Sequence, residues 1–141
     1  MLGALLRAPT DAIRARMLQA LHAAGFTDLV AAHLVVLRYP GPEGLRPVEV
    51  AGNTGMTRQA TNYLLGQLEE LGYLERRKDP DDPRATRIHM TRRGTDVGRV
   101  IRAAVTEVED EWAEAIGREE IEQLRALLTR LYAVVAAPPS D

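Results

Sequence analysis

The segment of this chain best equipped to bind another molecule runs from Thr57 to Tyr63, where polar side chains follow one another. An arginine can form two parallel hydrogen bonds with guanine, and a glutamine or asparagine can pair in the same way with adenine. Arg58, Gln59 and Asn62 are therefore candidates for contacts with base edges. Thr57 and Tyr63 carry hydroxyl groups that suit phosphate oxygens.

A second group of candidates lies in a basic segment, residues 74–94. Its bases are Arg76, Arg77, Lys78, Arg84, Arg87, Arg92 and Arg93, and its acids are Glu75, Asp79, Asp81 and Asp82. Residues 107–122 carry eight acidic residues and one basic residue, so the net charge of −2 conceals the basic region. We expect phosphate contacts from Arg76, Arg77, Lys78 and Arg87. Because side chains alternate along a strand, Arg76 and Arg77 cannot both face a nucleic acid.

Catalysis and metal binding find no support in the sequence. There are no cysteines, and His22, His33 and His89 lack the close spacing of metal ligands. No nucleophile triad, phosphate-cradling glycine loop or pair of catalytic carboxylates is recognisable. We therefore expect no enzymatic activity, no metal and no cofactor. The absence of a signal peptide and of a run of about 20 apolar residues indicates a cytoplasmic protein.

The N-terminal part is predicted to be helical. Pro9, Thr10 and Asp11 are typical of a helix start, and Gly25 is typical of a helix end. Thr27 is predicted to cap a second helix. The apolar stripe of that helix consists of Val30, Leu34 and Leu37.

The candidate residues fall on a predicted winged helix. A short helix over residues 47–54, a tight turn at Gly55 and a helix capped by Thr57 form a helix-turn-helix. Residues 73–78 and 86–91 have the alternation of two strands that return on each other as a hairpin. A hairpin directly after a helix-turn-helix is a wing.

Two more helices are predicted after the wing. Thr91 caps a long one, Gly117 interrupts it, and a last helix runs to about Val135, followed by a frayed tail over residues 136–141. Their apolar stripes are longer than the winged helix needs, which calls for a second chain. The predicted fold class is mainly α with a small β-hairpin: a winged helix-turn-helix core flanked by N- and C-terminal dimerisation helices.

Three stretches carry a family resemblance. They are "GMTRQATNYLLGQLEELGYLERR" (residues 55–77), "DDPRATRIHMTRRG" (residues 81–94) and "AAHLVVLRYP" (residues 31–40). In this order and spacing they resemble the MarR family of bacterial transcription regulators, and the resemblance covers about residues 10–135. It implies that Arg84 is the arginine at the tip of the wing, which enters the minor groove, and that Asp82 holds it. Pro83 departs from the commoner family pattern, in which this position is often polar or basic.

The resemblance also implies a homodimer joined through its terminal helices. The chain would be a single domain of residues 1–141, with 27–93 as the DNA-binding region and 1–25 and 94–136 as dimerisation helices. Two-fold symmetry then predicts a pseudo-palindromic operator. A small ligand would bind near His33, Leu37 and Trp112, although Trp112 also suits the core of a dimer.

The predicted function is sequence-specific binding of duplex DNA, by a repressor whose ligand favours a dimer with wrongly spaced recognition helices. A regulator that activates, or one that has no ligand, fits the same residues. A different class is a winged helix that binds another protein. Arg58 and the basic wing favour DNA, because a protein-binding wing more often shows an apolar patch.

Overall fold

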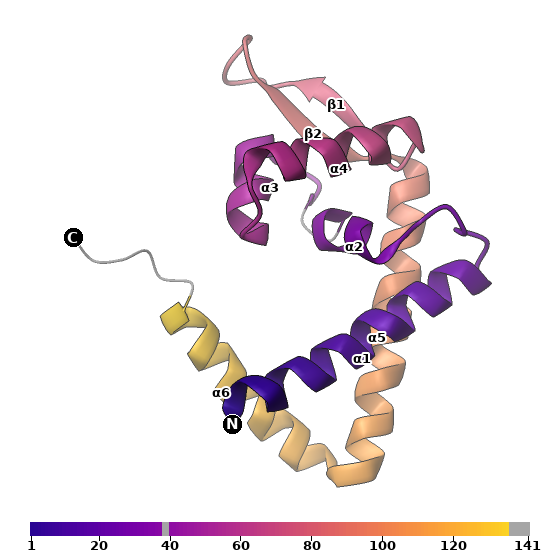
Figure 1. Cartoon of the computed structure of the whole chain (residues 1–141), viewed down its shortest axis with the longest axis vertical. Coiled ribbons are helices and arrows are strands. Elements are labelled where there is room, and N and C mark those ends of the chain that lie inside the picture. The colour runs from indigo at the N-terminus through magenta and orange to yellow at the C-terminus, as the bar shows by residue number, and fades with distance from the viewer. Residues whose placement is uncertain (38–39, 136–141) are drawn as a thin grey trace. The chain divides into compact units, whose positions relative to one another are not determined.

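The computed structural model describes residues 1–37 and 40–135. The predicted tail and residue 136, the predicted limit of the dimerisation helices, lie outside these ranges. The elements in chain order are α1 (Leu2–Ala23), α2 (Ala31–Leu37), α3 (Pro47–Thr54), α4 (Arg58–Glu70), β1 (Leu74–Lys78), β2 (Thr86–Met90), α5 (Arg92–Ile116) and α6 (Arg118–Val135) (Figure 1). This order confirms the predicted class, a mainly α chain with a β-hairpin as the wing.

The chain forms two compact units, and the boundary between Ala104 and Val105 falls within α5. The first unit contains α1 to α4, the hairpin and the first part of α5. The second contains the rest of α5 and α6. No helix in the described ranges is long and apolar enough to cross a membrane.

The predicted start of the first helix is wrong. α1 begins at Leu2, and Pro9 lies inside it. Thr10 does not cap a helix end, because its hydroxyl donates a hydrogen bond to the Leu6 carbonyl at 2.8 Å. The stretch before Pro9 is rich in leucine and alanine, which are strong helix formers. They keep this stretch helical although Pro9 has no N–H for the backbone hydrogen bond to the preceding turn.

The second helix also begins later than predicted, at Ala31. Leu34 and Leu37 are buried as expected, whereas Val30 precedes the helix and is 52% exposed. Thr27 lies four residues before the helix start, too far away to cap it.

The helix-turn-helix follows the prediction closely. Pro47 is the first residue of α3, and Gly55 ends that helix with a φ of 68°, a conformation that glycine adopts without steric cost. The Thr57 hydroxyl then caps α4 by accepting the Ala60 backbone N–H at 3.1 Å. α3 and α4 pack against each other and against α2.

The wing is an antiparallel hairpin in which Arg76 pairs with Ile88 and Arg77 pairs with Arg87. Leu45 adds two backbone hydrogen bonds to the outer edge of β2 at Ile88 (2.7 and 3.1 Å). Ile88 is fully buried, so one face of the hairpin packs on the core while the tip projects beyond α4 (Figure 1).

Tyr73 joins the end of α4 to the first strand and to α5. Its side chain is fully buried, and its hydroxyl donates a hydrogen bond to Asp28. The Arg93 guanidinium lies 4.4 Å from the centre of the Tyr73 ring and donates to the same carboxylate at 2.9 Å. Burial, and then the Asp28 carboxylate, raise the pKa of Tyr73 to about 12. The hydroxyl of Tyr73 and then the charge of Arg93 lower the pKa of Asp28 against the opposing effect of burial.

The second unit consists of the C-terminal part of α5 followed by α6. Val108, Ala113 and Ile121 are buried, and Trp112 is half-buried. Arg125 of α6 donates to Glu109 of α5 at 2.9 Å.

The backbone approach at Gly94 gives a stability prediction. A methyl group at Gly94 would collide with the Tyr73 carbonyl oxygen, so Gly94→Ala should lower the free energy of unfolding by about 1–3 kcal/mol. Gly66→Ala is the matched control: nothing lies within 4 Å of its added methyl group, and a glycine leaves a helix interior, so it should stabilise by about 0.5–1 kcal/mol. Urea unfolding of both variants measures the difference, and equal effects would contradict the close approach.

Candidate nucleic-acid interface

The exposed side of α4 carries the predicted base-contacting residues. Arg58, Gln59 and Asn62 are exposed and have no hydrogen-bond or ion-pair partner among the described residues. The opposite side of the helix buries Thr61, Leu64, Leu65 and Leu68. The donors and acceptors of the exposed side are therefore available to another molecule.

Tyr63 extends this exposed side and is 66% exposed. Its hydroxyl accepts a hydrogen bond from the Gln67 side-chain amide at 3.1 Å. The amide oxygen of Gln67 in turn lies 3.1 Å from Nε2 of the buried His33. Gln67 escaped sequence reasoning because a half-buried glutamine late in a helix gives no signal of its own.

The wing tip is held through its backbone. The Asp82 carboxylate accepts the Arg84 backbone N–H at 3.0 Å, and the Asp82 carbonyl accepts the Ala85 N–H at 3.0 Å. The Arg84 guanidinium has no partner among the described residues and is exposed. Asp82 thus orders the turn that carries Arg84, while the guanidinium itself stays uncommitted.

Asp79 organises the start of the wing loop, directly after β1, a role that the sequence pattern did not indicate. Its side chain is fully buried and accepts hydrogen bonds from the Arg46 Nε at 2.6 Å and the Asp81 backbone N–H at 2.9 Å. Nε of Arg87 approaches the same carboxylate at 3.2 Å, without the alignment of a hydrogen bond. The Asp81 N–H and then the Arg46 guanidinium lower the pKa of Asp79, although burial opposes them. Arg46 directly precedes α3, so this cluster ties the wing to the helix-turn-helix.

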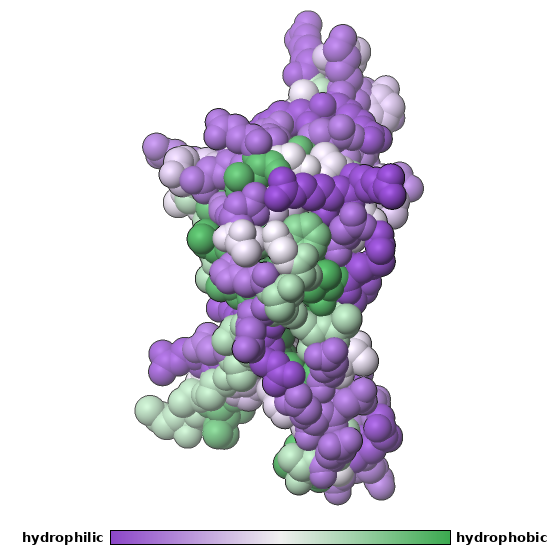
Figure 2. Space-filling view, turned by 90° about the vertical axis from the view of Figure 1, so that its right-hand side faces the viewer, coloured by the Kyte–Doolittle hydropathy of each residue, from purple (hydrophilic) through white to green (hydrophobic). Residues whose placement is uncertain are grey.

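The basic side chains of the wing differ in how far they are paired with carboxylates. Arg76 is paired with Glu69 of α4 at 2.8 Å, and Arg77 is paired with Glu75 on the opposite face of the strand. Arg87 is only 23% exposed because it turns toward Asp79. Lys78 is exposed and has no partner among the described residues. Lys78 and Arg84 are therefore the uncommitted cations of the hairpin, whose tip is almost wholly hydrophilic at the top of Figure 2.

Residues 24–85 match the family model described as MarR family. The matched segment contains α2, α3, α4 and β1, which form most of the winged helix-turn-helix. CouR from Rhodococcus jostii RHA1, solved with p-coumaroyl-CoA, is 25% identical with a TM-score of 0.74, over 99% of this chain and 94% of CouR. A MarR-family regulator from Rhodococcus sp. RHA1 is 25% identical with a TM-score of 0.73, over 99% and 95% of the two chains.

The fold is also similar to that of wild-type MarR from E. coli in its apo form. The identity is 22% and the TM-score is 0.72, over 93% of this chain and 96% of that one. The chain therefore has the fold of MarR-family transcription regulators.

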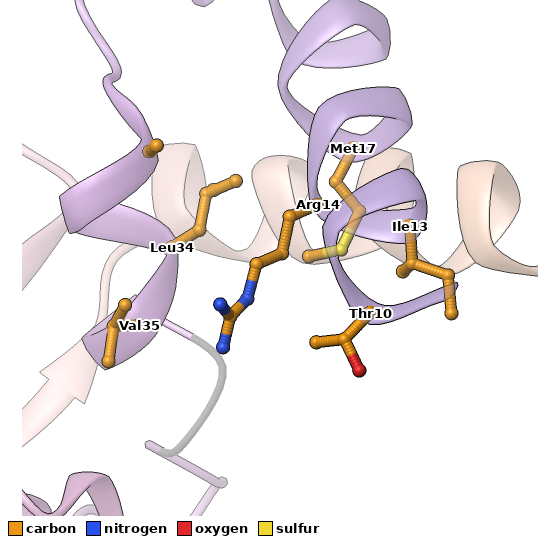
Figure 3. Close-up of a pocket in the computed structure, with 7 residues that line it drawn as sticks. Thr10, Ile13, Arg14, Met17, Leu34 and Val35 are labelled. Carbon is orange, nitrogen blue, oxygen red and sulfur yellow. The ribbon is translucent and has the colours of Figure 1, made fainter. Parts of the chain in front are cut away.

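A cavity of about 260 Å³ lies between α1 and α2 (Figure 3). Its apolar lining comes from Ile13, Met17, Ala31, Leu34 and Val35, and its polar groups belong to Thr10 and Arg14. In Figure 3 the Arg14 guanidinium points into the space between the two helices.

The predicted ligand residues on α2 do not line this cavity. His33 and Leu37 are buried, and His33 is hydrogen-bonded within the fold, to the Val30 N–H and to Gln67. The third predicted residue, Trp112, belongs to the second unit.

Replacing Asp79 tests the cluster at the start of the wing loop. The lowered pKa means that the charged carboxylate contributes stability above its unfolded pKa of about 3.9, and that this contribution is lost as the pH falls through the lower folded value. Asp79→Asn should therefore lower the urea midpoint of unfolding at pH 7. As the pH falls, the midpoint of this variant should decrease less than that of the wild type. Asp81→Asn removes the same charge from a 77% exposed side chain and should change little. Urea unfolding from pH 7 to pH 2 measures both, and an acid profile of Asp79→Asn equal to wild type would contradict this role.

Proposed function

We propose that this protein is a DNA-binding transcription regulator that recognises a pseudo-palindromic operator as a homodimer. One observation carries the proposal: the exposed side of α4 and the wing carry polar side chains that have no partner among the described residues. They are Arg58, Gln59 and Asn62 on the helix and Lys78 and Arg84 on the hairpin. An α-helix fits the major groove, where polar side chains near its N-terminus read base edges.

The residues take different roles in this proposal. Arg58, Gln59 and Asn62 read bases, whereas Thr57, Tyr63 and Lys78 bind phosphates. The Thr57 hydroxyl accepts a backbone N–H as a helix cap, and its own hydrogen remains free to bond a phosphate oxygen. Arg84 enters the minor groove, whose negative potential is strongest in narrow A·T-rich segments.

Arg76, Arg77 and Arg87 contribute to the phosphate-binding surface by their charge. Each of these arginines attracts a phosphate less strongly than Lys78 does, because its guanidinium already faces a carboxylate. The pairs of Arg76 and Arg77 lie at the surface, where ion pairs are weak and can exchange partners when a phosphate approaches.

Unpartnered apolar side chains on the terminal helices support the homodimer. On α1, Leu2 and Leu5 are 64% and 68% exposed. On α6, Leu127, Tyr132 and Val135 are between 59% and 75% exposed, and Ile121 is that helix's buried apolar residue. Apolar helix faces of this length are stabilised when a second chain covers them.

We propose that the dimer acts in the cytoplasm and represses transcription by occupying a promoter. A small molecule would relieve repression by changing the spacing of the two recognition helices. CouR, which shares the fold, was solved with p-coumaroyl-CoA, and the α1–α2 cavity combines an apolar lining with one guanidinium. The residues predicted from the family, His33, Leu37 and Trp112, remain candidates for the same effector response.

Arg84→Ala tests DNA binding through the wing. The variant should keep its thermal stability, bind a duplex from its own upstream region more weakly, and show a salt dependence about one unit shallower per wing in log Kd against log salt. Arg99→Ala removes the same charge from an exposed site on α5 and should leave affinity unchanged. Fluorescence anisotropy at several salt concentrations measures both. A wild-type protein with no salt-sensitive affinity for any duplex would instead favour a protein-binding winged helix.

Introducing charge on the apolar face of α6 tests the homodimer. Leu127→Glu combined with Leu131→Glu places carboxylates on the exposed apolar face and should shift the protein from dimer to monomer in analytical ultracentrifugation. Val48→Glu adds a carboxylate at an exposed apolar residue of α3 and should leave the dimer intact. A double variant that stays dimeric at low micromolar concentration would rule out this face.

A further inference from the structure

A chain of hydrogen bonds leads from the backbone before α2 to the surface of the recognition helix α4. The Val30 N–H lies 3.2 Å from Nδ1 of His33, Nε2 of His33 lies 3.1 Å from the Gln67 amide oxygen, and the Gln67 amide nitrogen lies 3.1 Å from the Tyr63 hydroxyl. Its inner members are buried, since His33 is only 4% exposed, whereas its outer end at Tyr63 is in solvent.

The chemistry of the first member fixes the direction of the whole chain. A backbone N–H can only donate, so Nδ1 of His33 must be the unprotonated, accepting nitrogen. A neutral imidazole then carries its hydrogen on Nε2 and donates it to the Gln67 oxygen. The Gln67 nitrogen is left facing the Tyr63 hydroxyl as a donor.

The Tyr63 hydroxyl thus receives a hydrogen bond from inside the protein. One lone pair of the hydroxyl oxygen accepts from Gln67, and the hydroxyl hydrogen remains free for another acceptor. Every bond in the chain donates outward, and the last free group is a donor on an exposed side chain.

We propose that His33 and Gln67 are positioning residues that present the Tyr63 hydroxyl as a hydrogen donor to a DNA phosphate. This inference rests on the proposed function, because it names how one predicted phosphate contact is oriented. A phosphate oxygen only accepts hydrogen bonds, so the relay supplies the matching polarity in advance. A free phenol would first have to restrict its rotation to do the same.

The histidine is essential to the mechanism because its two nitrogens play opposite parts. Protonated on both, it would face the Val30 N–H with a second donor, and the relay would break at its buried end. The His33 ring is buried and hydrogen-bonded through both nitrogens. It therefore holds the Gln67 amide with its oxygen toward Nε2 and excludes the orientation in which the amide oxygen and nitrogen are exchanged.

A double-mutant cycle between Tyr63 and Gln67 tests the proposal. Tyr63→Phe should weaken binding of the full-length protein to an operator duplex by about tenfold per half-site, through loss of one hydrogen bond to a charged group. Gln67→Met preserves the length of the side chain without its amide and should weaken binding less. In the Tyr63→Phe background, Gln67→Met should cause no further loss, since no hydroxyl remains to be oriented.

Two substitutions of His33 separate positioning from support of the fold. Asparagine places an acceptor near Nδ1 but no donor toward Gln67, whereas glutamine places an amide donor near Nε2. His33→Gln should therefore retain most of the DNA affinity, and His33→Asn should lose as much as Gln67→Met. Thermal unfolding of each variant controls for folding, and the cycle above stands if either variant fails to fold.

The outcomes distinguish this inference from the proposed function. A wild-type protein that binds no duplex defeats the proposed function. A wild type that binds normally, together with losses from Tyr63→Phe and Gln67→Met that simply add, overturns the relay while leaving the function in place.

Discussion

The buried Tyr73 is the interaction on which the rest of the winged helix depends. Its carbonyl oxygen accepts the Thr91 backbone N–H at 3.1 Å and lies against Gly94, so the end of the wing and the start of α5 are fixed at the same peptide. Its ring lies beneath the Arg93 guanidinium, and its hydroxyl is bonded to Asp28 before α2. Because α4 ends just before Tyr73 and β1 begins just after it, the orientation of the recognition helix relative to the wing is set here.

Charge in this protein is divided between structure and surface. Arg46, Arg87 and Arg93 are engaged by the carboxylates of Asp79 and Asp28 and hold separate segments together. Arg58 and Arg84 have no such partner among the described residues and remain on the outside. The net charge of −2 therefore says little about the partner, since the cations that matter are those that the fold leaves unpaired.

Local signals explain why so much of the fold was predictable. Pro47, Gly55 and Thr57 act through backbone conformation or hydrogen bonds within three residues, and all three lie where the pattern predicted. Pro9 misled the prediction because a proline after a favourable helical stretch can be absorbed within the helix. For the wing, the predicted link between Asp82 and Arg84 is present, but through the backbone N–H and not the guanidinium.

The sequence by itself determined the order of the elements, the exposed polar stripe of α4 and the arginine at the tip of the wing. The first two follow from periodicity, caps and turns that act over a few residues, whereas the place of Arg84 follows from the family resemblance of residues 81–94. Only the tertiary structure decided which arginines form internal ion pairs, since Arg46 and Asp79 are 33 residues apart in the chain. It alone also joined His33 to Gln67, 34 residues away, and so to Tyr63. Contacts of this kind depend on how helices and strands pack, and no local pattern of residues encodes them.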